Sequence, residues 1–292
     1  MHQLKSTLLL MRIPFSFLLM PVFWFALSQI NDRDALKAYI IFIVLHLFIY
    51  PASNGYNSYM DKDIGSIGGI KNPPKPTKQL LYASILFDTL GIALALQIHL
   101  LFAIGITIYV LVSRAYSWDG IRIKKYGWPA FFTVSIFQGG YIYLLTYVFA
   151  QPVYSPNSFF DVKAIMPAVI SSVNIAGIYP ITQIYQHKDD EKAGVKSLSR
   201  ILGIKGTFLF SGILFLASSL LTFYYFNTIN QNHLSYLYCV FMLPVGLYFT
   251  WWYSKTKNDI RQASFRNTMI MSGISATFFN LYYMIIILMR QF

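Results

Sequence analysis

Charged residues and cysteine are both scarce in this sequence. Only 12% of the 292 residues are charged and 56% are hydrophobic, whereas a soluble domain carries about 25% charged residues. The lone Cys239 excludes an internal disulfide. No serine–histidine–aspartate order, zinc-protease motif or P-loop motif is present. The sequence therefore gives no support to a soluble disulfide-rich domain, a hydrolase, a zinc protease or a P-loop protein.

Long apolar runs are abundant instead. Each of about 20 residues is long enough to cross a bilayer core, and we expect an all-α polytopic membrane protein in which they form nine helices. The expected spans are near 7–29, 38–58, 80–97, 100–117, 129–150, 164–184, 206–226, 234–253 and 268–289. We interpret residues 1–292 as one membrane-embedded domain with two four-helix units, about 1–128 and 129–253, and a ninth helix at 268–289.

The basic residues indicate the orientation of these helices. With the N-terminus inside, all but four of the 23 lysines and arginines fall on the inner side; the exceptions are Arg33, Lys37, Lys163 and Arg290. Cytoplasmic loops of membrane proteins carry such an excess. We therefore expect a bacterial-type inner (plasma) membrane protein with a cytoplasmic N-terminus. The net charge of +12 needs no nucleic acid partner, because it lies in short loops beside apolar segments.

Two acidic segments end the second and the sixth expected helix on this cytoplasmic side. The first is 54–63 and the second is 186–192. Residues four apart on a helix are neighbours. A continued helix would therefore place Asn57 beside Asp61, and Gln186 beside Asp190.

The chemistry of these segments suits a metal ion and phosphate. Carboxylates are hard oxygen ligands for Mg²⁺, which commonly bridges to phosphate oxygens. The acids are Asp61, Asp63, Asp189, Asp190 and Glu191, and the interleaved lysines are Lys62, Lys71, Lys192 and Lys196. Metal and lysine together neutralise charge on a diphosphate leaving group. Glycine-containing loops follow both segments, and the first also contains prolines; such irregular backbone can add N–H groups to an anion site.

The apolar helices behind the acids suggest a substrate with a long hydrocarbon tail. Aromatic faces attract cations, and an allylic diphosphate that loses its leaving group becomes a carbocation. The candidate aromatic residues include Phe15, Phe17, Trp24, Tyr56, Tyr59, Phe137, Tyr141, Tyr143, Tyr147, Tyr179 and Tyr185. Asp88 lies inside the third expected helix. A charged side chain within a membrane is energetically costly, so Asp88 is a candidate functional residue.

The two motifs together resemble the UbiA superfamily of intramembrane prenyltransferases. The first is Asn57-x-x-x-Asp61, and the second ends in Asp190 and is followed by Lys-Ala-Gly-Val-Lys-Ser at 192–197. Arg12-Ile-Pro14 in helix one, Tyr116-Ser117 with Arg122-x-Lys124 after helix four, and the nine helices agree with it. The resemblance spans nearly the whole chain.

The resemblance implies nine helices around a central cavity open sideways to lipid. It implies that two Mg²⁺ ions bind a prenyl diphosphate and that the ionised prenyl group alkylates an aromatic or other small acceptor, such as a quinone head group. The implied metal ligands are Asn57, Asp61, Asp63, Gln186 and Asp190, and the implied catalytic residues are Asp61, Asp190, Lys124, Lys192 and Lys196. The expected substrate-binding residues are Arg12, Asn54, Asn57, Arg122, Lys62, Lys71, Tyr116, Tyr141, Tyr185 and Gln186.

The chain departs from the family pattern at two positions. The first motif usually has another aspartate four residues after Asp61, where this chain has Gly65 and offers Asp63 instead. The second motif usually begins with aspartate where this chain has Gln186. An amide oxygen can still ligate a cation, although it carries no charge.

Two other functions are compatible with these residues. The same carbocation could close on itself, which would make the protein a membrane terpene cyclase. The chain could also be a transporter, or a non-catalytic family member that binds lipid or prenyl diphosphate. Transporters often place related broken helices near the membrane midplane, whereas the related segments here lie at helix ends on one side.

Overall fold

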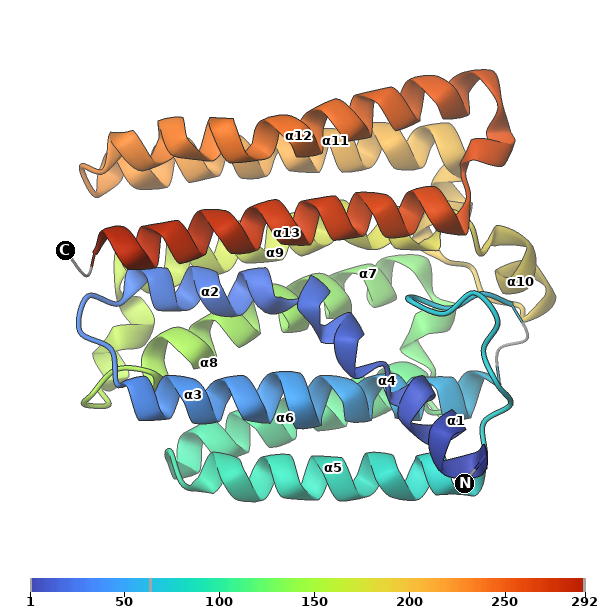
Figure 1. Cartoon of the computed structure of the whole chain (residues 1–292), viewed down its shortest axis with the longest axis horizontal. Coiled ribbons are helices and arrows are strands. Elements are labelled where there is room, and N and C mark those ends of the chain that lie inside the picture. The colour runs from blue at the N-terminus through green and yellow to red at the C-terminus, as the bar shows by residue number, and fades with distance from the viewer. Residues whose placement is uncertain (1, 63–64, 291–292) are drawn as a thin grey trace.

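The computed structural model describes residues 2–62 and 65–290, which form a bundle of long helices (Figure 1). In chain order the elements, with short 3-10 or π-helical segments labelled η, are α1 (His2–Met11), η1 (Ile13–Leu18), α2 (Met20–Gln29), α3 (Ala35–Ile43), η2 (Val44–Ile49), α4 (Tyr50–Asp61), α5 (Lys78–Leu96), α6 (Leu100–Ser117), η3 (Ile123–Lys125), α7 (Gly127–Ser135), η4 (Ile136–Tyr141), α8 (Ile142–Phe149), η5 (Pro156–Phe160), α9 (Val162–Gln183), α10 (His187–Lys192), α11 (Leu198–Thr228), α12 (Asn232–Asn258), η6 (Ile260–Gln262) and α13 (Phe265–Met289).

The membrane spans agree with the sequence prediction. Among the described residues, eight helical stretches are long and apolar enough to cross a membrane, and a bent pair, Gln3–Leu18 with Met20–Gln29, makes a ninth. The eight are Ala35–Asp61, Lys78–Leu96, Leu100–Ser117, Gly127–Phe149, Val162–Gln183, Leu198–Thr228, Asn232–Asn258 and Phe265–Met289. The grouping into two four-helix units stays a prediction.

The first and seventh spans differ from regular helices. The first bends by 41° between Gln3–Leu18 and Met20–Gln29, where Pro21 stands in the first turn of α2. Earlier in the same span, Arg12 takes a left-handed backbone (φ 49°) before η1 begins. The seventh begins at Leu198 rather than near 206. A short helical stretch precedes a break at Gly203, whose φ of 67° is a left-handed backbone that favours glycine, and the long helix follows the break. The break in α11 lies toward the end of the bundle that carries α10 (Figure 1).

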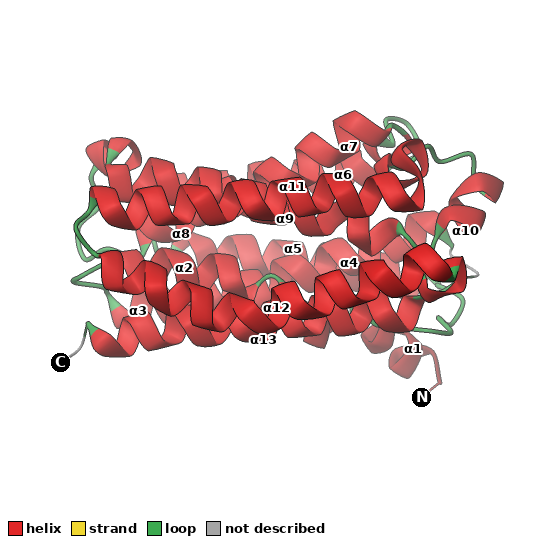
Figure 2. Cartoon of the chain, turned by 90° about the horizontal axis from the view of Figure 1, so that it is seen from above, coloured by secondary structure: helices red, strands yellow, loops and turns green. Residues whose placement is uncertain are grey.

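The distribution of side chains is that of a membrane protein. Leu111, Leu209, Leu220 and Leu243 are each more than 60% exposed on the outside of the bundle, whereas many serine and threonine side chains are buried inside it. Exposed leucines in such numbers fit lipid contact rather than water. Figure 2 shows the long helices side by side, with the loops gathered at the two ends.

Both acidic segments lie at the same end of the bundle. Figure 1 places α10 and the last turn of α4 at the end that also carries the N-terminus, while the C-terminus lies at the opposite end. The prediction that the two segments share one side of the membrane is therefore confirmed as a matter of geometry. Which side faces the cytoplasm stays a prediction.

Asp88 has a structural partner. It forms an ion pair with Arg114, and both side chains are largely buried. The Arg114 guanidinium also lies 4.0 Å from the centre of the Tyr56 ring and 3.5 Å from the Ala52 carbonyl oxygen. This contact joins α5 and α6 to α4, which carries Asn57 and Asp61. We infer that Asp88 positions α4 rather than taking part in chemistry.

The ion pair predicts a large stability effect. Asp88→Ala leaves the Arg114 charge buried without its partner, which costs roughly 3–5 kcal/mol. We expect a clear fall in the melting temperature of the detergent-solubilised protein, measured by tryptophan fluorescence. Asp259→Asn is the control, because Asp259 pairs with the 87% exposed Arg261 side chain and exposed pairs contribute little. Equal melting temperatures for the two variants would contradict this account of Asp88.

Candidate functional site

One cavity of about 700 Å³ brings the two acidic segments together. Asn57 and Asp61 of α4 line it, and so do Gln186 and Asp190. Its wall also includes residues from η1, α2, α6, α9, α11, α12 and α13. Segments more than a hundred residues apart in the sequence therefore meet at one site.

The predicted site residues fall into two groups. Those that line the cavity are Arg12, Asn54, Asn57, Asp61, Tyr116, Lys124, Tyr185, Gln186 and Asp190. Those that do not line it are Lys62, Lys71, Lys192 and Lys196, whose side chains are exposed, together with Arg122 and Tyr141. The Tyr141 hydroxyl instead donates to the Gly105 carbonyl oxygen at 2.8 Å and so ties η4 to α6. Asp63 lies outside the described residues.

Lys124 pairs with one of the two carboxylates and acts electrostatically on the other. Its ammonium forms an ion pair with Asp61, and its charge also acts on Asp190. The loop that carries it is held by backbone pairing, because the Lys196 N–H donates to the Lys125 carbonyl oxygen at 3.1 Å. The lysine thus comes from the α6–α7 loop but is positioned by the segment that follows α10.

Asp61 presents one oxygen that has no hydrogen-bond partner. Its side chain is only 5% exposed, and its Oδ1 is buried without a hydrogen bond, with the Arg122 guanidinium 3.9 Å away. One turn earlier, the Asn57 amide nitrogen donates to Ser117 Oγ at 2.7 Å. This contact leaves the Asn57 amide oxygen for another donor or a cation. A buried oxygen without a hydrogen-bond partner calls for an explanation, and a bound cation is one.

Asp190 is a second carboxylate at the same mouth and is half-buried. The Ser197 hydroxyl donates to its Oδ2 at 2.6 Å. Burial raises the pKa of Asp190, as does the negative charge of Asp189, while Ser197, Lys124 and Arg200 oppose that rise. A group whose charged form is destabilised by burial gains from a nearby cation.

The second acidic segment is not a continuation of α9. That helix ends at Gln183, and a separate short helix, α10, begins after Gln186. The spacing of Gln186 and Asp190 still places them one turn apart, because the Asp190 N–H donates to the Gln186 carbonyl oxygen at 2.8 Å. Nearby, burial and the charge of Arg200 lower the pKa of His187.

The loop after α4 closes over this mouth. Gln186 Nε2 donates to the Ser66 carbonyl oxygen at 3.2 Å. Arg12 donates to the carbonyl oxygens of Gly68 and Asn54, each at 3.3 Å. The left-handed turn at Arg12 therefore lets the first span hold both α4 and its loop.

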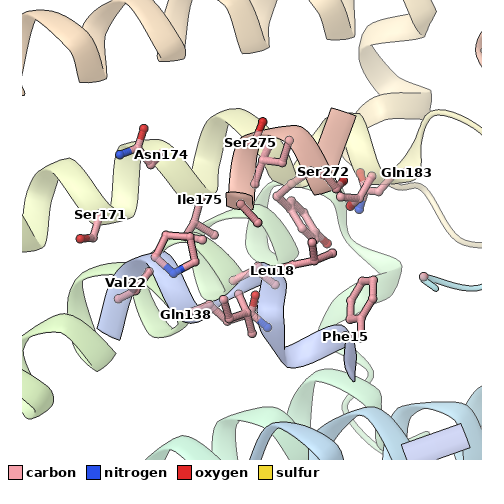
Figure 3. A pocket seen from close by; sticks show the side chains of 18 of the residues that line it. Phe15, Leu18, Val22, Gln138, Ser171, Asn174, Ile175, Gln183, Ser272 and Ser275 are labelled. Carbon is pink, nitrogen blue, oxygen red and sulfur yellow. The ribbon is translucent and has the colours of Figure 1, made fainter. Parts of the chain in front are cut away.

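Beyond the acids the cavity becomes aromatic and apolar. The Tyr116 and Tyr179 hydroxyls lie 2.7 Å apart, and they mark the border between the charged mouth and this part of the cavity. Figure 3 shows Phe15, Leu18 and Val22 of the first span across the cavity from residues of α9, such as Ile175. The site thus joins a charged mouth to a long interior that is mainly apolar, with some polar side chains such as Asn174 on its wall.

The donors fit a magnesium ion only together with a ligand. Carboxylate and amide oxygens are hard donors of the kind that Mg²⁺ prefers. Within residues 2–62 and 65–290, no group of three histidine, cysteine, aspartate or glutamate side chains is placed to hold a metal ion. Oxygens of water or of a bound diphosphate would complete the coordination.

The model of the UbiA prenyltransferase family matches residues 18–281. The chain belongs to this family. Together with the apolar spans, membership shows an integral membrane protein. No functionally curated protein matches the sequence.

Solved structures share the whole fold. A UbiA homologue from Archaeoglobus fulgidus bound to DMAPP and Mg²⁺ is 17% identical with a TM-score of 0.71, over 97% of this chain and 99% of that chain. A structure described for digeranylgeranylglyceryl phosphate synthase is 20% identical with a TM-score of 0.63, over 98% of each chain. The apo homologue from Aeropyrum pernix K1 is 15% identical with a TM-score of 0.68, over 91% of this chain and 97% of that chain.

Several wall residues of this UbiA-family protein escaped the sequence analysis. Gln138, Ser171, Asn174 and Gln183 line the cavity (Figure 3). The available signal was their polarity within apolar spans, because polar residues in membrane helices face the interior. For Gln138, polarity alone could not predict its place on the wall. It belongs to the π-helical segment η4, which changes the helix face that each residue occupies.

The Lys124–Asp61 pair predicts a gain in cation affinity when the lysine is removed. A bound cation must displace or tolerate the Lys124 ammonium, and even 1.4 kcal/mol of repulsion corresponds to about tenfold in affinity. We expect Lys124→Met to bind Mn²⁺ about tenfold more tightly in the absence of diphosphate, measured by electron paramagnetic resonance. The control is Lys192→Met, because Lys192 is exposed and off the cavity wall. Weaker Mn²⁺ binding by Lys124→Met would refute the assignment.

Proposed function

We propose that the protein transfers an isoprenoid chain from a prenyl diphosphate to a small aromatic or other acceptor within the membrane, with Mg²⁺ as cofactor. The observation that carries this proposal is that Asp61, with its partner Lys124, and Asp190 line one intramembrane cavity. Family membership supports it. So do the Archaeoglobus fulgidus homologue structures bound to DMAPP or GPP with Mg²⁺.

The mouth of the cavity would bind the diphosphate. Asn57, Asp61, Gln186 and Asp190 would hold Mg²⁺, and Lys124 would turn from Asp61 toward phosphate oxygens. When bound, Mg²⁺ neutralises charge that develops on the leaving group. The exposed lysines would attract the dianionic or trianionic substrate from a distance; they are Lys62, Lys71, Lys192 and Lys196.

The reaction breaks one bond and forms another. The bond between the prenyl C1 and its diphosphate oxygen breaks, and its electron pair leaves with the diphosphate. An acceptor carbon or oxygen then supplies the pair for the new bond to C1 and loses a proton. The Tyr116 and Tyr179 rings lie at the border where positive charge would develop, and aromatic faces stabilise such charge.

The distribution of basic residues supports a proposal for the membrane and the orientation of the protein. We propose a bacterial-type inner membrane with the N-terminus and the acidic mouth in the cytoplasm, because the basic residues gather at that end. Water-soluble diphosphate could then reach the charged mouth while its hydrocarbon tail lies in the apolar interior. A quinone head group is one acceptor of suitable chemistry.

Turnover tests the proposal directly. We expect protein in lipid nanodiscs with Mg²⁺ to consume geranyl or dimethylallyl diphosphate when a panel of phenolic, quinol and polar-lipid acceptors is supplied, and mass spectrometry to detect a prenylated acceptor. Chelation of Mg²⁺ should abolish turnover. A cyclised hydrocarbon in place of that product would instead indicate a terpene cyclase, and binding without consumption would indicate a non-catalytic member.

Variants of the two carboxylates test the site. Asp61→Asn and Asp190→Asn should each lower kcat by about a hundredfold or more, because each removes charge needed at the leaving group. Asp259→Asn is the matched control, since Asp259 pairs with Arg261 outside the cavity wall. Unchanged kcat in both site variants would overturn the assignment of these carboxylates.

A further inference from the structure

Away from the charged mouth, the cavity wall carries polar side chains in the middle of the membrane spans. Asn174 lies in α9, which ends at Gln183, and Ser275 lies in α13, which begins at Phe265. Both of those helix ends are at the end of the bundle that carries α10 (Figure 1). At a rise of 1.5 Å per residue, each side chain stands roughly 15 Å from that end. Since a bilayer core is about 30 Å thick, these polar groups lie near its middle.

The Asn174 amide keeps a hydrogen-bond donor that no protein group uses. Its Oδ1 accepts from the Ser218 hydroxyl of α11 at 2.8 Å. Within residues 2–62 and 65–290, no acceptor pairs with its Nδ2. Figure 3 shows Asn174 and Ser275 across the cavity from Phe15. A polar group in an apolar interior is costly without a partner, so a ligand that accepts a hydrogen bond gains affinity there.

Two serines of α13 offer hydroxyls close to this level. Ser272 and Ser275 line the cavity, and their buried Oγ atoms have no hydrogen-bond partner in the part of the chain that the structure describes. Several hydroxyls elsewhere in the spans bond the carbonyl oxygen one turn earlier, as Thr107 does at 2.8 Å. A change of rotamer directs a serine hydroxyl toward a ligand. We call Asn174, Ser272 and Ser275 the polar subsite.

The helices around the polar subsite bring no charge to the cavity wall. Among the described residues, every wall residue of α9, α11, α12 and α13 is uncharged. The charged wall residues are Arg12, Asp61, Lys124 and Asp190, which belong to the mouth and to the contacts that close it. An ionised ligand group would lose its hydration at the polar subsite without gaining an opposite charge. The polar subsite therefore favours a neutral oxygen, such as that of a hydroxyl or carbonyl group.

We propose that the polar subsite binds an oxygen of a neutral acceptor, such as a phenol, a quinol or an alcohol, in the middle of the membrane. The inference rests on the proposed function. On α9, Tyr179 stands between Asn174 and the mouth, and its hydroxyl meets that of Tyr116 at the border. An acceptor held by its oxygen at Asn174 would therefore extend toward the carbon that loses the diphosphate. Acceptor affinity then depends on a polar group remote from the acids.

A pair of ligands that differ by one hydroxyl tests this assignment. 2-Naphthol and 2-methylnaphthalene have similar shapes, but only the first can exchange hydrogen bonds. Each is titrated into the full chain in lipid nanodiscs, and the melting temperature, followed by circular dichroism, gives the concentration for half-maximal stabilisation. The original protein should need about tenfold less 2-naphthol than 2-methylnaphthalene, the scale of one hydrogen bond. Partition into lipid is the same for every variant, so a change in this ratio reports on the protein.

Removal of the Asn174 amide should abolish the preference. Asn174→Leu should reduce it to less than about twofold, because the apolar side chain has no donor, while 2-methylnaphthalene binding stays within about threefold of the original. The matched control is Asn280→Leu, because Asn280 is a buried asparagine of α13 whose amide has no hydrogen-bond partner and which is not on the cavity wall. The control should keep the preference.

A serine variant tests the same subsite with a smaller change. Ser275→Ala removes no partner of another described residue, so the fold should be kept, and the preference should fall about threefold. Its control is Ser211→Ala, because Ser211 is a buried serine of α11 whose hydroxyl has no partner and which is not on the cavity wall. A preference that neither Asn174→Leu nor Ser275→Ala lowers overturns the inference. An equal loss in the two control variants also overturns it.

Turnover separates this inference from the proposed function. With geranyl diphosphate and a phenolic acceptor, Asn174→Leu should raise the KM of the acceptor about tenfold and leave the KM of geranyl diphosphate within about twofold. If the original protein turns over and both KM values stay unchanged in Asn174→Leu, the subsite is overturned and the function stands. If the preference depends on Asn174 but no acceptor is prenylated, the proposed function falls and a site for a neutral ligand remains. Binding of 2-naphthoate that depends on Asn174 would overturn the assignment of a neutral ligand.

Discussion

The ion pair between Lys124 and Asp61 is the interaction on which the site depends. The Asp61 side chain is 5% exposed at the end of a membrane helix, so its charge needs a nearby opposite charge. Lys124 provides that charge, and it also acts electrostatically on Asp190. Because Lys124 is held through the pairing of Lys125 with Lys196, the second half of the chain supplies the support for the first. The two acidic segments are thereby linked before any ligand binds.

Irregular backbone does much of the positioning around this pair. The left-handed turn at Arg12 lets the first span hold the α4 loop, and the π-helical segments η2 and η4 change the register of α4 and α8 relative to the helices before them. Single-turn π-helical segments are rare and are frequently found at functional sites. Here residues in or beside both segments line the cavity, so the segments help to set the shape of the site.

Features that depend on the bilayer could be predicted from the sequence, whereas contacts that depend on packing between helices could not. The spans and the shared end of the acidic segments followed from apolar length and basic charge, which depend on the membrane. Asn57 and Asp61 were predictable as neighbours because one helix carries both. The contact of Asp189 with Gly65 was not, because it depends on how a short helix docks after α9 ends. The same limit explains Asp88, whose partner Arg114 comes from the next helix.

The two ends of the bundle differ in a way that suits carbocation chemistry. At the end opposite the acids, Arg290 donates to the Ser28 carbonyl oxygen and to Gln231 Oε1, and Tyr225 donates to Gln29 Oε1 at 2.7 Å. These bonds join the first span to the seventh and to the end of the last, and they join the end of the last span to the start of α12. Because the acidic side chains lie at the other end of the bundle, a diphosphate at Asp61 and Asp190 would point its hydrocarbon tail along the cavity toward this end. The apolar part of the cavity wall would then keep water, the commonest competing nucleophile, away from the carbon that loses the diphosphate.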